Sequence, residues 1–212
     1  AAKISDMLTD DGVLSTLGQF GFGEYTGAML PGESLGNFPD PERMSFEKKR
    51  SLSFGYGISV TTAQLARAYS VFANNGSLQD LKISKHLISR APTQIVSKKT
   101  SNQVLTMLEK AVSQGTGKLA QIANFDVAGK TGTVRKVNVE GYSEDEHTVF
   151  FAGILPAKST NYVCVVVIDN PRANGSTGGE VAAPVFSKLM GELIRTFGLQ
   201  PSYENSVSRG EI

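Results

Sequence analysis

The sequence predicts a mixed α/β domain of the α+β type, in which an antiparallel sheet is flanked by helices and joined to a helical lobe. Three observations predict this class. Apolar side chains recur at helical spacing over residues 61–72 and 100–112. Residues 125–168 hold three short runs rich in β-branched and aromatic residues, which are typical of strands. Residues 180–197 form a further helical pattern, with an apolar stripe suited to covering a sheet.

The first part of the chain is predicted to combine helices with a long loop. Residues 3–17 carry apolar side chains at roughly helical spacing, which Gly12 is expected to interrupt. Residues 18–57 are rich in Gly and Pro, so we expect an ordered loop with one short helix near residues 45–50. A loop of that length in a compact domain is more often functional than not.

Two capping-box patterns mark the predicted starts of the central helices. Thr61 and Gln64 form the first pattern, and Thr100 and Gln103 form the second. Gly115 is expected to end the second helix. These are two separate helices and not a sequence repeat.

Three strands are predicted over residues 125–133, 147–155 and 161–168. The charged residues 140–146 are expected to form a loop between the first two strands. Every position from 163 to 168 is apolar, which predicts that the third strand is covered on both faces.

The 212 residues are enough for one domain with a substantial core, or at most two small ones. By its predicted secondary structure, the chain divides into a mainly helical lobe (1–122), a sheet with the last helix (123–200) and a tail (201–212). The first residues, Ala-Ala-Lys-Ile, read like the interior of a helix. We therefore expect the chain to be part of a longer protein.

Composition excludes several classes of function. The chain has 21 Lys and Arg against 20 Asp and Glu, and no basic cluster alternates with aromatic residues, so nucleic acid is not an expected partner. Cys164 is the sole cysteine of the sequence, cannot close an internal disulfide, and is expected to be a small core residue. The longest apolar run, residues 162–168, is too short to cross a bilayer.

The most informative motif is Ala-Gly-Lys-Thr-Gly-Thr at residues 128–133. A phosphate-binding P-loop is excluded, because Asn124 stands where that motif requires its first glycine. Two interpretations remain open from the motif alone. One is a plain strand with a tight glycine, and the other is the Lys-Thr-Gly box of penicillin-recognising serine enzymes.

Strand alternation predicts how the second interpretation would work. Lys130 and Gly132 should lie on one face of the strand, and Thr131 and Thr133 on the other. The lysine would then place a positive charge beside a nucleophilic serine, while the threonine hydroxyls bind a carboxylate. Gly132 would let the substrate backbone approach closely.

Further segments occur in the order of one known family. They are residues 20–23 (Phe-Gly-Phe-Gly), 53–61, 64–69, 115–117 with Ala120, 129–133, 151–153, 166–169, 178–179 and 183–186. With these segments, the chain resembles the C-terminal part of the transpeptidase domain of class B penicillin-binding proteins. The resemblance is strongest to the division-specific type, penicillin-binding protein 3.

The resemblance implies a penicillin-binding protein transpeptidase fold, similar to that of serine β-lactamases. It implies a D,D-transpeptidase that cross-links peptidoglycan stem peptides in septal cell-wall synthesis, through a serine acyl-enzyme that β-lactams imitate. Lys130 would be catalytic, and the backbone N–H of Thr133 would be one oxyanion donor. Thr131, Gly132 and Thr133 would bind the substrate or the β-lactam.

Three further residues would lie near the rim of the active site by resemblance, namely His147, Ser176 and Thr177. A surface histidine is the alternative interpretation of His147. Relatives can carry aromatic residues in the loop before residues 178–179, where residues 174–177 offer none.

The family also uses a Ser-x-x-Lys box and a Ser-x-Asn box, and the resemblance places both before Ala1. We therefore expect that the first part of the domain is missing and that this chain holds no nucleophile. Residues 45–48 fit the first box and residues 159–161 fit the second. We reject both, because the former lies in the wrong chain order and the latter in a turn between strands.

The resemblance implies no metal and no organic cofactor. The implied partners are D-Ala-D-Ala stem peptides, β-lactams, the missing N-terminal part, and cell-division and glycan-polymerising membrane proteins. The implied location is the periplasmic side of the bacterial inner membrane, with an anchor outside this chain. Two alternatives remain: a serine β-lactamase or D,D-carboxypeptidase relative, and a non-catalytic penicillin-binding or divisome-interaction module.

Overall fold

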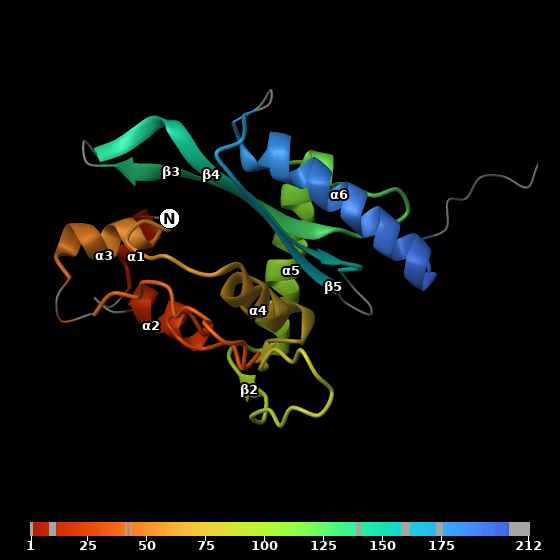
Figure 1. The fold of residues 1–212 in the computed structure, drawn as a ribbon, viewed down its shortest axis with the longest axis horizontal. Helices are drawn as coiled ribbons and strands as arrows, with labels where there is room; N and C mark the ends of the chain where they lie inside the picture. Colours follow the sequence, from red (N-terminus) through yellow and green to blue (C-terminus); the bar gives the residue numbers. More distant parts are fainter. Residues whose placement is uncertain are drawn as a thin grey trace, which may run out of the picture. The chain divides into compact units, whose positions relative to one another are not determined.

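The computed structural model describes residues 2–8, 12–40, 42, 44–138, 141–157, 162–172 and 176–203 (Figure 1). The chain divides into two compact units, Ala1–Ser101 and Asn102–Ile212. The division falls inside helix α5 (Lys98–Ser113) and so precedes the lobe boundary expected at residue 122. In the part of the chain that is described, no helix combines the length and apolar character needed to span a membrane.

The first unit contains short helices and a small two-stranded ladder. The short helix predicted near residues 45–50 is present, and Ser45 caps it. Gly12 begins a helix instead of interrupting one. The elements are α1 (Ala2–Ser5), α2 (Gly12–Gln19), α3 (Phe46–Leu52), α4 (Thr62–Ala73), β1 (Ser77–Leu78) and β2 (Thr93–Gln94). Strands β1 and β2 pair antiparallel.

One of the two predicted capping boxes is confirmed. At the start of α4, Gln64 N donates to Thr61 Oγ1 over 3.1 Å and Thr61 N donates to Gln64 Oε1 over 2.9 Å. The prediction for α5 is wrong, because that helix begins at Lys98. Ser97 Oγ accepts from Thr100 N over 3.1 Å, so an equally suitable cap residue three positions earlier takes the role.

The second unit is built on an antiparallel sheet that helix α6 (Gly178–Phe197) covers on one face (Figure 1). Its described strands are β3 (Ala128–Asn138), β4 (Gly141–Leu155) and β5 (Tyr162–Asp169), in the order β3-β4-β5. A short 3₁₀ helix, η2 (Lys118–Ala120), also packs against α6. The predicted fold class, a sheet flanked by helices, is confirmed.

Strands β3 and β4 form a longer hairpin than the sequence predicts. Residues 141–146 belong to β4 and not to a loop, and the register shifts between Arg135 and Val137. The ladder is made of backbone hydrogen bonds, so charged side chains can continue it where one or both faces meet water. A bulge of this kind bends the hairpin and lets pairing resume beyond it.

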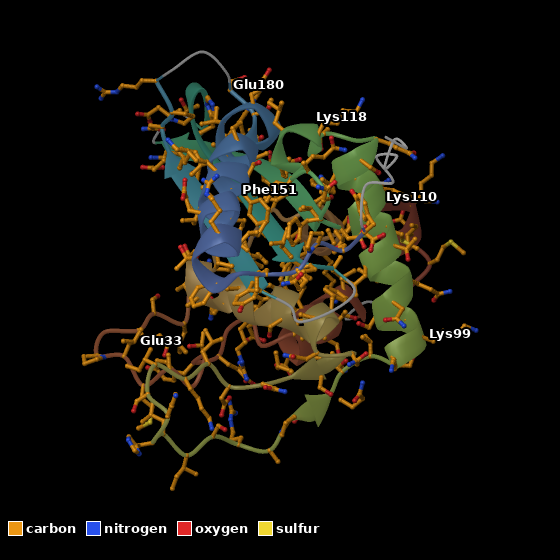
Figure 2. All side chains as sticks on the ribbon, turned by 90° about the vertical axis from the view of Figure 1, so that its right-hand side faces the viewer. Glu33, Lys99, Lys110, Lys118, Phe151 and Glu180 are labelled. Carbon is orange, nitrogen blue, oxygen red and sulfur yellow. The ribbon has the colours of Figure 1, made fainter. Side chains whose placement is uncertain are left out.

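The core of the second unit lies between α6 and the sheet. Phe151 and Phe186 are fully buried there, with ring centroids 4.8 Å apart, and Figure 2 labels Phe151 at this place. Gly129 pairs with Gly153 across β3 and β4. A Cβ at Gly129 would lie 2.5 Å from the Phe151 ring, and one at Gly153 would lie 2.7 Å from it. The paired glycines therefore make the space that the ring occupies.

Two predictions of burial were too broad. The apolar stripe predicted over residues 180–197 includes Val185 and Leu189, but these are 45% and 52% exposed. The face of α6 toward the sheet centres on Phe186 and Met190. Strand β5 is not covered on both faces, since Val167 is 43% exposed.

Arg67 of α4 is a buried charge whose partners come from the segment after β1. Its Nη2 lies 3.2 Å from Asp80 Oδ1, and its Nε donates to the carbonyl of Gln79 over 2.9 Å. Asp80 also accepts from Arg90 Nη2 over 2.8 Å, and hydrogen bonds from Arg90 lower the pKa of Asp80. Gly27 has φ +85°, and a Cβ there would lie 2.5 Å from that of Asp80, so the loop closes on this network only through glycine.

Replacing Asp80 with Asn is expected to lower the free energy of unfolding by about 3 kcal/mol at neutral pH, because Arg67 keeps a buried charge without its counter-ion. The pKa of Asp80 is lowered in the folded state, so its ionic stabilisation is present above the ordinary value of 3.8 and is lost as the pH falls through the lowered pKa. Thermal melts of wild type and Asp80→Asn should therefore differ at pH 7, begin to approach each other near pH 3.8 and converge only below the lowered pKa.

The exposed Glu42 provides a control, since Glu42→Gln should leave the melting temperature unchanged at pH 7. A gap between wild type and Asp80→Asn that stays constant down to acid pH would contradict the assignment.

Candidate active site on strand β3

Strand β3 carries the predicted alternation of its side chains. Gly132 pairs with Phe150 on one face, which is also the face of Lys130. Thr131 and Thr133 lie on the opposite face, where they meet the start of α6. Lys130 is exposed, and its Nζ donates to the carbonyl of Thr131 over 3.0 Å. The strand thus presents a cation on one side and two hydroxyls on the other.

The Thr133 hydroxyl is held by the N-terminus of α6. Gly178 N donates to Thr133 Oγ1 over 3.2 Å. A Cβ at Gly178 would lie 2.5 Å from the carbonyl oxygen of Gly132, so the helix can approach the strand this closely only with glycine there. Because Thr133 Oγ1 accepts from a backbone N–H, its own proton stays available for donation. The positive end of the helix dipole also favours an anion near this hydroxyl.

The Thr131 hydroxyl has a partner that sequence analysis missed. Thr116 Oγ1 lies 2.7 Å from Thr131 Oγ1, and either oxygen can be the donor. Thr116 follows α5 in the Gly-Thr-Gly turn at residues 115–117, which the resemblance had singled out without giving Thr116 a role. That turn was the available signal, but the pairing joins residues 15 positions apart.

Gly132 has a structural reason to be glycine beside the expected functional one. A Cβ at residue 132 would overlap the ring of Phe150 on the neighbouring strand. The glycine therefore accommodates Phe150, whatever approaches the strand from outside.

Two of the predicted rim residues form the cap of α6. Thr177 Oγ1 accepts from Glu180 N over 3.3 Å and donates to Glu180 Oε2 over 2.9 Å. Ser176 N also donates to Glu180 Oε2, over 3.1 Å. These hydrogen bonds, that of the Thr177 hydroxyl first, lower the pKa of Glu180, which Figure 2 labels at the start of the helix. Of the loop predicted to lack aromatic residues, residues 174–175 lie outside the described part of the chain.

His147 makes none of its described contacts with Thr131 or Thr133. It pairs with Arg135 across β3 and β4, and its carbonyl accepts from Asn170 N over 3.0 Å. Its Nε2 is buried, and within the described residues this nitrogen has no hydrogen-bond partner. The structure therefore leaves the role of His147 at the rim as a prediction.

The other nucleophile candidates have structural roles or lie outside the description. Ser45 Oγ accepts from Lys48 N over 3.4 Å as the cap of α3, which agrees with rejecting it as a nucleophile. Cys164 packs half-buried against the core, and burial raises the pKa of its thiol, so it is a poor nucleophile. Residues 159–161 are not among those described.

A pocket of about 550 Å³ lies elsewhere in the second unit. It is lined by the second half of α5, the segment after η2 and Tyr203, including Glu109, Val112, Gln121, Phe125 and Asp126. None of the predicted site residues lines it, so it is not the site that strand β3 presents.

Comparison with known families identifies the class of domain. Residues 1–191 match the model of the penicillin binding protein transpeptidase domain. The chain therefore belongs to the family of penicillin-binding protein transpeptidase domains. Its relatives are those of the class B members, as the resemblance predicted.

Two curated relatives and one solved structure illustrate the similarity. The chain is 35% identical to the probable peptidoglycan D,D-transpeptidase PbpC of Pseudomonas aeruginosa, over 94% of this chain and 36% of that protein. It is 33% identical to the peptidoglycan D,D-transpeptidase FtsI of Escherichia coli, over 94% and 34% respectively. The transpeptidase domain of Burkholderia pseudomallei penicillin-binding protein 3 matches with a TM-score of 0.87 and 30% identity, over 96% of this chain and 62% of that one.

The chain thus spans about a third of the length of these curated relatives. The predicted transpeptidase fold is confirmed by the structural match.

Replacing Gly132 with Ala is expected to lower the free energy of unfolding by about 1–3 kcal/mol, because the new methyl group would overlap Phe150. Shortening the neighbour in the double variant Gly132→Ala/Phe150→Leu should recover part of that loss. Thermal denaturation of the variants measures both effects.

Gly191 is a matched control, since a Cβ there would meet nothing within 4 Å and Gly191→Ala should not destabilise α6. Equal melting temperatures for Gly132→Ala and wild type would contradict the steric interpretation of Gly132.

Proposed function

We propose that this chain is the C-terminal portion of a single domain of a peptidoglycan D,D-transpeptidase, which cross-links stem peptides through a serine acyl-enzyme. One observation carries the proposal: β3 presents the exposed Lys130 on one face and the hydroxyls of Thr131 and Thr133 on the other. Membership of the transpeptidase family and the names of its relatives support it. Similarity to FtsI supports a role in septal wall synthesis.

The residues of β3 have distinct proposed roles. The Lys130 ammonium stabilises negative charge near the nucleophile and assists proton transfer. The hydroxyls of Thr131 and Thr133 donate to the terminal carboxylate of the stem peptide. The backbone N–H of Thr133 donates to the carbonyl oxygen that becomes an oxyanion during attack.

The reaction then follows a double displacement. The oxygen of a serine in a Ser-x-x-Lys box outside this chain attacks the carbonyl between the two D-alanines. The peptide bond breaks, the terminal D-alanine leaves with a proton on its nitrogen, and the remaining acyl group stays on the serine as an ester. An amine of a neighbouring stem attacks that ester, releases the serine and forms the cross-link.

The proposed setting follows from this substrate. Peptidoglycan stem peptides are available on the periplasmic side of the inner membrane, where a segment outside this chain would anchor the protein. The proposed partners are the rest of the same domain and the cell-division and glycan-polymerising membrane proteins. β-Lactams act as imitations of the D-Ala-D-Ala end.

Adduct mapping with a fluorescent penicillin tests the proposed function. In the protein at its full encoded length we expect one stoichiometric adduct, on the serine of a Ser-x-x-Lys box, and no adduct on residues 1–212. Mass spectrometry of the digested adduct identifies the serine. A stoichiometric adduct on Ser45 would contradict the expected order of the boxes, and rapid turnover of the penicillin would indicate a β-lactamase instead.

Removing the Lys130 ammonium group tests its proposed role. We expect Lys130→Met to slow acylation by the fluorescent penicillin at least roughly 100-fold, because the developing negative charge loses the cation that we propose stabilises it. Lys136→Met is the matched control, because Lys136 lies on the same strand but pairs with Asp169 over 2.7 Å. Equal acylation rates for the two variants would rule out the proposed role.

A further inference from the structure

We propose that Thr116 is a positioning residue for this site, where its hydroxyl turns the Thr131 hydroxyl into a hydrogen-bond donor toward an anionic ligand. The inference rests on the proposed function, because it concerns how β3 binds the carboxylate of its substrate. The observation that carries it is the 2.7 Å contact between Thr116 Oγ1 and Thr131 Oγ1.

The two threonines of β3 have partners of different kinds. Thr133 Oγ1 meets the backbone N–H of Gly178, which can only donate, so the Thr133 proton is always left for another acceptor. Thr131 Oγ1 meets another hydroxyl, and a hydroxyl pair can be bonded in either direction. In one direction Thr131 donates to Thr116 and has no proton left for a ligand.

A carboxylate removes this ambiguity. An ionised carboxylate only accepts hydrogen bonds, so it selects the direction in which Thr116 donates to Thr131 and Thr131 donates to the ligand. Each bond in such a chain polarises the next, which strengthens the contact with the anion. A neutral ester oxygen also only accepts, but it forms a weaker hydrogen bond than an ionised carboxylate and so gains less from this arrangement.

The position of Thr116 is determined by two elements of the second unit, the end of α5 and the start of α6. Gly117 N donates to the carbonyl of Ala111 over 3.0 Å, which ties the turn to the end of α5. A Cβ at Gly179 of α6 would overlap the Thr116 carbonyl oxygen and would lie 3.6 Å from Thr131 Cγ2. Thr116 and Thr131 therefore meet in the space that Gly179 leaves open. Both the turn and the helix hold the hydroxyl in place before any ligand arrives.

The test compares a ligand that has a carboxylate with one that lacks it. Acylation rate constants of the full-length protein are measured with benzylpenicillin and with its methyl ester, by competition against a fluorescent penicillin. Thr116→Val keeps the shape of the side chain and removes the hydroxyl. We expect it to slow acylation by benzylpenicillin roughly 3- to 10-fold and acylation by the ester by a smaller factor, because a bond to an ionised acceptor is the stronger one.

Two further variants distinguish a positioning role of the Thr116 hydroxyl from a packing role of its side chain. Thr116→Ser should restore the wild-type rate, since it keeps the hydroxyl. In the Thr131→Val background, Thr116→Val should cause no further loss with benzylpenicillin, because the hydroxyl it acts through is already absent. Thr106→Val removes a hydroxyl of α5 that donates to the Asn102 carbonyl, and it should leave both rates unchanged.

Three results would overturn the inference. They are an unchanged benzylpenicillin rate in Thr116→Val, an equal loss with both ligands, and additive losses in the double variant. If wild-type protein is not acylated by either ligand, the proposed function fails, and the inference fails with it. If Thr116→Val does not fold, Thr116→Ser and Thr116→Ala are compared instead, and a loss that is confined to the alanine variant and larger with benzylpenicillin than with the ester is the expected result.

Discussion

The geometry of the candidate site depends on how closely the N-terminus of α6 approaches strand β3. Gly178 lies against the backbone of Gly132, and Gly179 lies against the carbonyl of Thr116. A side chain at either glycine would push the helix outward and lengthen the hydrogen bond from Gly178 N to Thr133 Oγ1. The two glycines set the separation, and this hydrogen bond forms because the separation is small.

The core beneath this contact keeps the helix in place. Phe151 packs over the glycine pair of β3 and β4 and against Phe186 of α6, and both rings are fully buried. Removing a buried aromatic ring typically costs about 3–5 kcal/mol, more than any single hydrogen bond at the site contributes. Apolar burial therefore supplies most of the stability of this contact, and the polar groups of β3 are positioned by it. The site and the core share one helix and one strand.

Local patterns predicted more than long-range ones. The alternation of Lys130 and Thr131 was predictable because it depends only on the period of a strand, and the cap of α4 because it spans four residues. The pairing of Thr116 with Thr131 was not, since it requires knowing where α5 ends relative to β3. At α5 two suitable caps competed, and the sequence alone could not rank Ser97 against Thr100. The length of β4 was missed because pairing with β3 extends a strand through charged residues.

The contact between Gly132 and Phe150 restricts which amino-acid substitutions this strand can accept during evolution. A side chain at position 132 would need the space that the Phe150 ring occupies. Enlarging position 132 first costs stability through that overlap, and shortening Phe150 first leaves a gap beside the glycine. Either order of these two substitutions is therefore expected to pass through a less stable variant. A phenylalanine with no part in the proposed chemistry thus restricts which variants of the Lys-Thr-Gly strand can arise by single substitutions.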